Sequence, residues 1–152
     1  MKQVRIAALN LLARREYSYA ELRERLLAKG FFKEEIDSVL NKLIDEGLQS
    51  DARVAQAHIH ARCFALYGPM RIEMELRGRG IADELMQHYL DNKAEMWFEI
   101  LQKAWKKKYS MSPKDKKEYG RQCRFLLQRG FSAAMIHHFL KSSISESIDE
   151  YE

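Results

Sequence analysis

The sequence is poor in the residues that build disulfide bonds and tight turns. Only two cysteines, two prolines and seven glycines occur among its 152 residues. Two cysteines are too few for a disulfide scaffold, which favours a reducing cytosolic environment. The scarcity of glycine and proline argues against a sheet of many short strands. The longest apolar run has five residues, 63–67, so we expect neither a membrane span nor a signal-peptide core.

Charged residues are numerous and are distributed unevenly along the chain. Hydrophobic residues make up 46% and charged residues 32% of the chain, which suits a packed core in one domain or a short array. Residues 103–129 contain ten basic and two acidic residues, a net charge of +8, whereas the whole chain carries only +4. The remainder is therefore acidic overall, and part of this acidity lies in residues 146–152. The basic window indicates an anionic partner.

The chain repeats at intervals of fifty residues. The equivalent glycines are Gly30, Gly80 and Gly130, and the equivalent leucines ten residues later are Leu40, Leu90 and Leu140. The apolar residues around them follow i, i+3, i+4 spacing, which indicates helices. We therefore predict an all-α protein of three tandem three-helix repeats forming an elongated, curved right-handed array. The expected boundaries are 1–48, 49–92 and 93–145, with an acidic tail at 146–152.

Start and stop signals define the helices within each repeat. The pattern predicts helices over 2–14, 18–29, 33–46, 51–66, 69–79, 83–91, 94–108, 113–129 and 133–145. Each repeat's glycine is expected just past the second helix, where a left-handed residue closes a Schellman motif. Ser18 and Glu21 form a predicted capping box. Ser112, Pro113 and Asp115 mark the predicted start of the last repeat's middle helix.

Motifs for catalysis or cofactor binding are missing from the sequence. It contains no glycine-rich phosphate loop and no HExxH zinc motif. His58 and His60 are two positions apart, so on a helix they point in different directions and cannot share one ion. We interpret these histidines and Cys63 as ordinary helix residues. The sequence predicts a protein that is not an enzyme and has no metal site and no cofactor.

The basic window supplies the functional signal that the sequence offers. Its residues follow helical spacing on two successive predicted helices, so they are expected to form one cationic stripe. The candidates for binding DNA or a protein filament in this window are Lys103, Lys106, Lys107, Lys108, Lys114, Lys117, Arg121 and Arg124. The alternative is a solvated helix face. Trp105 and Tyr109 either stack on bases or pack into the core, and for Trp105 the core interpretation is favoured because it continues an apolar stripe.

The middle repeat carries a recognisable signature. Its residues are Ser50-Asp51-Ala52-Arg53-Val54-Ala55, Arg62, Tyr67-Gly68-Pro69-Met70-Arg71-Ile72-Glu73-Met74-Glu75-Leu76 and Arg79-Gly80-Ile81. This pattern resembles that of the RecX family, which regulates the bacterial RecA recombinase. Residues 17–26 of the first repeat are also similar to the family. The chain departs from the family pattern at Ser50, usually Asp, and at Val54, usually Phe.

The resemblance implies a non-enzymatic modulator in the cytoplasm that acts in DNA repair, recombination and the SOS response. Such proteins bind RecA filaments on single-stranded DNA and suppress ATP hydrolysis, strand exchange and co-protease activity, by lying in the filament groove or blocking filament growth. The partners expected are therefore the RecA filament and single-stranded DNA, contacted directly or through the filament, with no membrane and with the protein as a monomer. A stand-alone nucleic-acid-binding helical module is the alternative. A helical scaffold for an acidic protein is a third possibility.

The signature residues have expected individual roles. Gly68 and Gly80 are expected to punctuate helices, and Asp51 to cap the N-terminus of its own helix. Arg53, Arg62 and Arg71 form either internal ion pairs or partner contacts, and for Arg71 a contact is slightly favoured. The remaining motif residues carried over from the family are Ile72 and Leu76.

Overall fold

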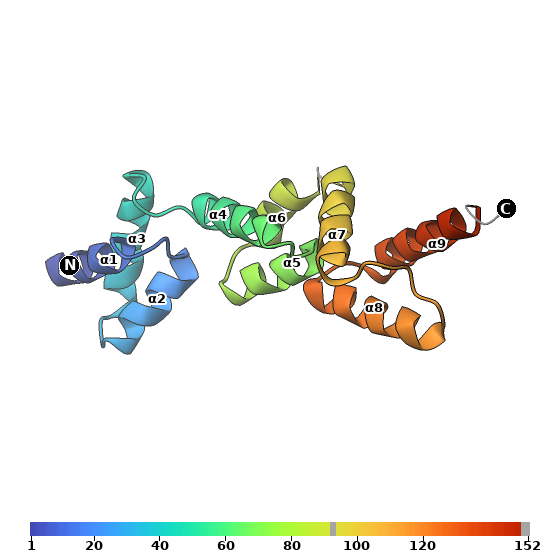
Figure 1. Ribbon diagram of the computed structural model, residues 1–152. Coiled ribbons are helices and arrows are strands. Elements are labelled where there is room, and N and C mark those ends of the chain that lie inside the picture. The colour runs from blue at the N-terminus through green and yellow to red at the C-terminus, as the bar shows by residue number, and fades with distance from the viewer. Residues whose placement is uncertain (92–93, 150–152) are drawn as a thin grey trace. The chain divides into compact units, whose positions relative to one another are not determined.

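The computed structural model describes residues 1–91 and 94–149, which form nine α-helices and no strand (Figure 1). The helices are α1 Lys2–Leu12, α2 Tyr19–Ala28, α3 Lys33–Asp45, α4 Asp51–Phe64, α5 Pro69–Gly78, α6 Asp83–Leu90, α7 Ala94–Lys108, α8 Lys116–Arg129 and α9 Ala133–Asp149. They occur where the fifty-residue repeat predicts them. The all-α, three-times-three architecture is thus confirmed.

Two helix ends differ from the prediction by three or four residues. Helix α8 begins at Lys116 and not at residue 113, because Asp115 has an extended backbone and its side chain accepts the Glu118 N–H at the N-cap. Helix α9 continues to Asp149, beyond the predicted end at 145. Residues 150–152 of the predicted acidic tail lie outside the described residues.

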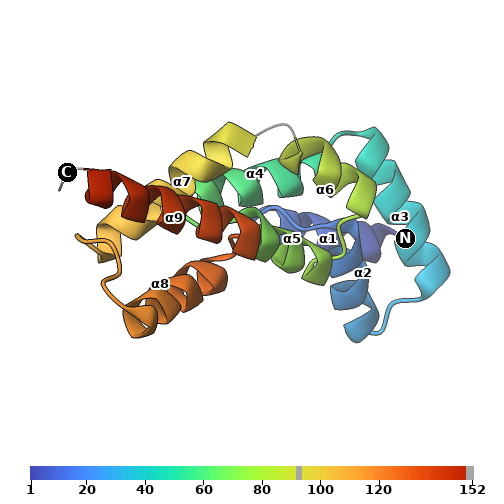
Figure 2. The same ribbon diagram turned by 90° about the vertical axis from the view of Figure 1, so that its right-hand side faces the viewer.

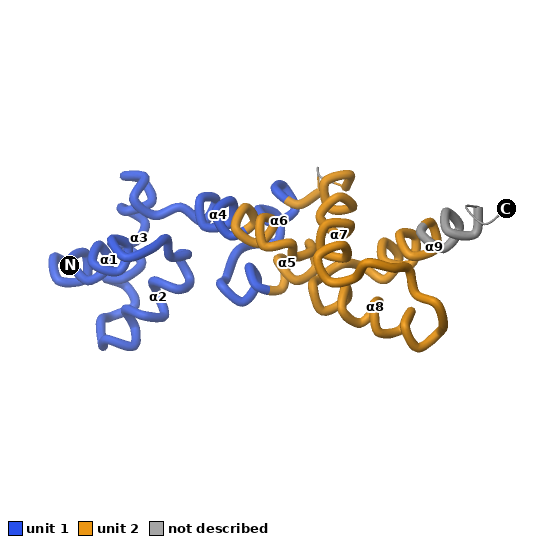
Figure 3. Tube along the Cα trace, viewed as in Figure 1, with its two compact units in different colours: residues 1–58, 75–89 blue, residues 59–74, 90–152 orange. Residues whose placement is uncertain are grey.

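Contacts group the chain into two compact units that divide the middle repeat (Figure 3). The first unit comprises residues 1–58 and 75–89, and within it α1, α2 and α3 pack against one another. The second comprises 59–74 and 90–152, and within it α7, α8 and α9 pack against one another (Figure 2). The boundaries between the three repeats remain a prediction.

The glycine turns are Schellman motifs, as predicted. Gly30, Gly80 and Gly130 have φ of 93°, 80° and 103°. In each turn the N–H of the residue after the glycine donates to the carbonyl of a fully buried leucine: Phe31 to Leu26 at 3.3 Å, Ile81 to Leu76 at 3.1 Å and Phe131 to Leu126 at 3.2 Å. Each motif therefore satisfies helix-end carbonyls and places an apolar pair against the core.

In the first unit, the turn at the end of α5 contacts the start of α2. The capping box of Ser18 and Glu21 is present, as expected. The Ser18 hydroxyl also donates to the Arg79 carbonyl at 2.5 Å. The Arg79 guanidinium in turn lies 3.0 Å from the Glu21 carboxylate. Although burial alone raises the pKa of Glu21, the hydrogen bond from Ser18 and the charge of Arg79 bring it below its usual value.

In the second unit, the equivalent turn at the end of α8 contacts the start of α5 through backbone hydrogen bonds. The Gly68 N–H donates to the Arg129 carbonyl at 2.7 Å, and the Met70 N–H donates to the Gly130 carbonyl at 2.9 Å. A Cβ on Gly68 would overlap the Gly130 backbone, and a Cβ on Gly130 would overlap Arg71. Amides at one helix start thereby meet carbonyls at another helix end, which satisfies both sets and aligns favourable partial charges.

Asp51 does not cap its own helix, so that prediction was wrong. The α4 N-terminus is capped by Ser50, whose hydroxyl accepts the Arg53 N–H at 3.2 Å. The Asp51 carboxylate instead accepts the Tyr19 N–H at 2.9 Å, in the first turn of α2. The tertiary contact takes the carboxylate because α2 offers an amide that lacks a partner within its helix.

Replacing Gly130 by alanine should destabilise the protein more than replacing Gly30. Both glycines have positive φ, so alanine introduces left-handed strain of about 1 kcal/mol at each. Only at Gly130 would the new Cβ also collide with Arg71, whereas at Gly30 nothing lies within 4 Å. We expect a loss of about 1 kcal/mol for Gly30→Ala and about 2–4 kcal/mol for Gly130→Ala. Urea unfolding followed by circular dichroism measures both, and equal losses would contradict the close-contact account.

Candidate nucleic-acid interface

The basic window lies on the end of α7, the connection 109–115 and α8, all within the second unit. The eight predicted contact residues of the window, Lys103, Lys106, Lys107, Lys108, Lys114, Lys117, Arg121 and Arg124, are all exposed. Seven of them are helical. Lys114 is not, because α8 begins two residues later, so this lysine belongs to the connection. The structure therefore brings the predicted cations onto one three-helix group.

Helix α7 turns its apolar residues inward and its lysines outward. Its buried residues are Trp97, Ile100, Leu101, Ala104 and Trp105. Lys103, Lys106 and Lys107 lie outside this apolar stripe and are exposed. Three lysines in the last turn also lie at the negative end of the helix dipole, which stabilises them there.

Helix α8 likewise turns its buried residues toward the core and its basic residues outward. Its buried residues are Gln122 and Leu126. Lys117, Arg121 and Arg124 follow each other at i, i+4 and i+7, so they share the face that points away from the core. The helix is thus amphipathic with a cationic outer face.

These cations differ from those of the first repeat in their partners. There, Arg5 lies 2.7 Å from Glu46 and Arg23 lies 2.9 Å from Asp37, and in the next repeat Arg53 lies 3.0 Å from Glu16. Within the described part of the chain, none of the eight predicted contact residues of the basic window forms an ion pair. The positive charge of the window consequently remains available to an anionic partner.

Of the two aromatic residues in the window, Trp105 belongs to the core. Its exposed fraction is 8%, its Nε1–H donates to the Gln122 side-chain carbonyl at 2.8 Å, and its ring meets Phe139 edge-on at 5.5 Å. The core interpretation is confirmed, and this ring does not offer a face for stacking on bases. Tyr109 is half-buried, with its ring 5.7 Å from that of Phe125.

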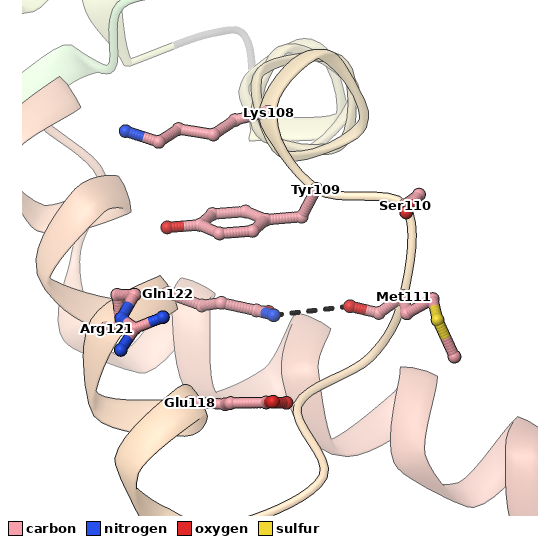
Figure 4. A pocket seen from close by; sticks show the side chains of 7 residues that line it. All are labelled: Lys108, Tyr109, Ser110, Met111, Glu118, Arg121 and Gln122. Atoms are coloured by element: carbon pink, nitrogen blue, oxygen red, sulfur yellow. Dashed lines mark hydrogen bonds between the residues drawn. The ribbon is translucent and has the colours of Figure 1, made fainter.

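A pocket of about 250 Å³ opens where α7 meets α8 (Figure 4). Lys108 lines it from the end of α7, Tyr109 from the connection, and Arg121 and Gln122 from α8. Gln122 is only 4% exposed, and its amide also donates to the Met111 carbonyl at 3.2 Å. The sequence indicated the cations but not this pocket, because spacing along the chain does not show that the Gln122 side chain bonds to both Trp105 and Met111.

Three arginines gather around Tyr67 in the same unit. The ring centroid lies 4.8 Å from the Cζ of Arg62, 4.6 Å from that of Arg71 and 4.0 Å from that of Arg129. Arg71 also donates to the Gln128 carbonyl at 3.0 Å, and Arg129 donates to the Ala65 carbonyl at 2.6 Å. Arg71 therefore contributes to the turn contact between α5 and α8. A contact of Arg71 with a partner stays a prediction.

The other residues of the signature make internal contacts or lie in the core. Arg53 pairs with Glu16 and donates to the Gly47 carbonyl at 2.8 Å, so the internal alternative describes it. Ile72 and Leu76 are fully buried. Tyr17, fifty residues before Tyr67, likewise carries a guanidinium over its ring, that of Arg15 at 3.7 Å.

The residues considered for metal binding or redox chemistry lie in ordinary surroundings. His58 lies 3.0 Å from Glu75, while His60 is exposed. Across residues 1–91 and 94–149, no three His, Cys, Asp or Glu side chains are arranged to hold a metal ion. Burial raises the pKa of the Cys123 thiol, which opposes an activated thiolate.

A membrane-spanning helix would need a longer apolar stretch than any helix in the described residues contains.

Comparison with known proteins identifies the repeats one by one. The models of the first, second and third three-helix domains of RecX match residues 5–43, 50–90 and 94–140. The regulatory protein RecX of Ectopseudomonas mendocina is 42% identical over 91% of this chain and 93% of its own. That of Chromohalobacter salexigens is 40% identical over 86% of both chains.

Solved structures share the fold. The crystal structure of RecX from Lactobacillus salivarius matches with a TM-score of 0.78 over 93% of this chain and 94% of that one, at 22% identity. A second crystal structure, of regulatory protein RecX, matches with a TM-score of 0.80 over 93% of this chain and 72% of that one, at 20% identity. At these identities the likeness concerns the fold alone.

Replacing Gln122 by methionine should destabilise the second unit. The change removes both side-chain hydrogen bonds of Gln122 and leaves the buried Trp105 N–H without an acceptor. We expect a loss of about 1–3 kcal/mol in the free energy of unfolding. Gln128→Met on the same helix is the matched control, because that side chain is exposed. Urea unfolding monitored by tryptophan fluorescence measures both, and equal effects would contradict the role of Gln122.

Proposed function

This chain belongs to the RecX family of regulatory proteins, and from that premise we propose that it binds filaments of the RecA recombinase on single-stranded DNA and inhibits them. The inhibition covers ATP hydrolysis, strand exchange and co-protease activity, through binding in the filament groove or blocking filament growth. The protein acts without catalysis of its own, as a monomer in the cytoplasm. The chain is thus a regulator of another protein's assembly.

The exposed cations of α7 and α8 are the observation that carries this proposal. Eight basic side chains lie on one three-helix group, and none of them is neutralised by an acidic side chain within the described residues. Such a surface is attracted to DNA phosphates and to acidic protein surfaces alike. A filament that combines nucleic acid with protein offers both kinds of partner.

A stand-alone nucleic-acid-binding module is the second candidate, because the same cations would suffice for bare DNA. The two functions differ in what they require. A module binds single-stranded DNA tightly without recombinase, with log K falling steeply as log salt rises. A filament regulator lowers the recombinase's rate of ATP hydrolysis at protein concentrations well below that of the recombinase.

Inhibition of the cognate recombinase tests the proposal directly. We expect the chain, added substoichiometrically to RecA on single-stranded DNA, to lower the rate of ATP hydrolysis. Reversing the charge of three exposed residues, Lys106→Glu, Lys107→Glu and Lys117→Glu, should raise the concentration for half-inhibition by about tenfold or more, because attraction becomes repulsion.

The matched control reverses three exposed lysines of the first repeat, Lys29→Glu, Lys33→Glu and Lys42→Glu. This control has the same net charge and should inhibit as the unmodified chain does, within about twofold. Absence of inhibition by the unmodified chain would refute the proposed function. Equal losses in both triple variants would show that net charge, and not the surface of α7 and α8, governs the effect.

A further inference from the structure

We propose that the pocket between α7 and α8 is a binding subsite for one phosphodiester of single-stranded nucleic acid, held by Lys108, Tyr109 and Arg121. This inference rests on the proposed function, since it names the group that the cationic surface recognises. The three residues come from two helices and the turn between them, and all three line the same cavity. The pocket is therefore a place where the fold brings together cations that helical spacing alone does not.

Lys108 is held by an aromatic face and not by a carboxylate. Its Nζ lies 4.5 Å from the centroid of Phe125, and the Tyr109 ring meets the same phenylalanine at 5.7 Å. A cation–π contact positions the ammonium without using its N–H donors in hydrogen bonds. These donors therefore stay available to an anionic oxygen.

Tyr109 and Arg121 complete the set of donors. In Figure 4 the Lys108 ammonium, the Tyr109 hydroxyl and the Arg121 guanidinium all end on the same side of the view, with the hydroxyl between the two cations. Within the described residues, neither the Tyr109 hydroxyl nor the Arg121 guanidinium has a hydrogen-bond partner or an ion pair. Two cations and one hydroxyl are a donor set suited to a phosphate.

The pocket is organised before any ligand arrives. The buried Gln122 side chain links the Trp105 ring of α7 to the Met111 carbonyl of the connection, and it does so from α8. These two hydrogen bonds fix the connection against both helices. A preorganised site binds at a lower entropic cost than one that forms on contact.

The size of the pocket suits a single phosphate group better than a whole small-molecule ligand. Its volume of about 250 Å³ is smaller than the roughly 300–1,000 Å³ typical of small-molecule sites. It also contains one acid, Glu118, which accepts the Lys114 N–H at 2.8 Å and lies on the far side of the Tyr109 ring from Lys108 (Figure 4). Glu118 repels an anion at its own end, so the phosphate is expected beside Lys108.

A double-mutant cycle on single-stranded DNA tests whether Lys108 and Arg121 share one phosphate. The probe is a fluorescein-labelled oligo-dT, and the affinity is measured over a range of salt concentrations. We expect Lys108→Gln and Arg121→Gln each to weaken binding by about fivefold to tenfold and to reduce the slope of log K against log salt by about 0.7. The double variant should lose little more than either single variant, because both remove the same contact.

The control cycle pairs Lys106→Gln with Arg121→Gln, since Lys106 is exposed on α7 but does not line the pocket. Its two losses should multiply. Tyr109→Phe keeps the ring and removes only the hydroxyl, and it should weaken binding by about threefold to tenfold. Multiplying losses in both cycles would overturn the pocket in favour of a diffuse cationic field, as would failure of the unmodified chain to bind oligo-dT.

Two further results separate this inference from its premise. If inorganic phosphate or dTMP binds as tightly as oligo-dT, the pocket is a free-anion site and the polymer assignment is wrong. If the unmodified chain inhibits RecA ATP hydrolysis while the Lys108 and Arg121 losses multiply, only the pocket is refuted. Coupled losses in a chain that does not inhibit RecA would retain the pocket and refute the proposed function.

Discussion

Contact between a glycine turn and a helix start is the constraint on which the rest of each unit depends. In the second unit, Gly68 and Gly130 let the start of α5 approach the end of α8 until backbone amides and carbonyls bond directly. In the first unit, Ser18 stands where Gly68 does in the repeat, and its hydroxyl, in place of a backbone amide, donates to the Arg79 carbonyl. Both solutions satisfy helix-end groups that would otherwise stay unpaired. The cations of α8 are presented from a helix whose C-terminal end is fixed in this way.

The fold was largely predictable, because its main signals are local. Glycine at fifty-residue intervals and apolar residues at helical spacing determine the turns and the faces of the helices, and both are visible without tertiary information. The errors arose where another part of the chain, or a stronger local cap, took over. Asp51 binds an amide of α2 instead of its own helix, and Asp115 starts α8 later than Pro113 suggested. An Asp in the sequence indicates that a helix N-terminus can be capped there, but the sequence does not indicate which helix its carboxylate will cap.

The residues of the candidate surface were predictable, but whether their charges are paired with acidic side chains was not. Counting charges located the +8 window, and helical spacing placed its members on outer faces. Whether acids elsewhere neutralise them depends on packing, and only the structure shows that Arg5 and Arg23 of the first repeat are paired while these cations are not. The pocket depends on the hydrogen bonds of Gln122 and on Phe125 beneath Lys108, which no spacing rule connects.

The central claim is that the unpaired cations of α7 and α8 make the contact with the filament. Lysine acetylation read by mass spectrometry, with and without RecA filaments on single-stranded DNA, measures this contact on the unmodified chain. We expect Lys106, Lys107 and Lys117 to become protected in the complex while Lys29 and Lys42 react as before, since all five are exposed in the chain alone. Protection of the first-repeat lysines with no change at α7 and α8 would contradict it.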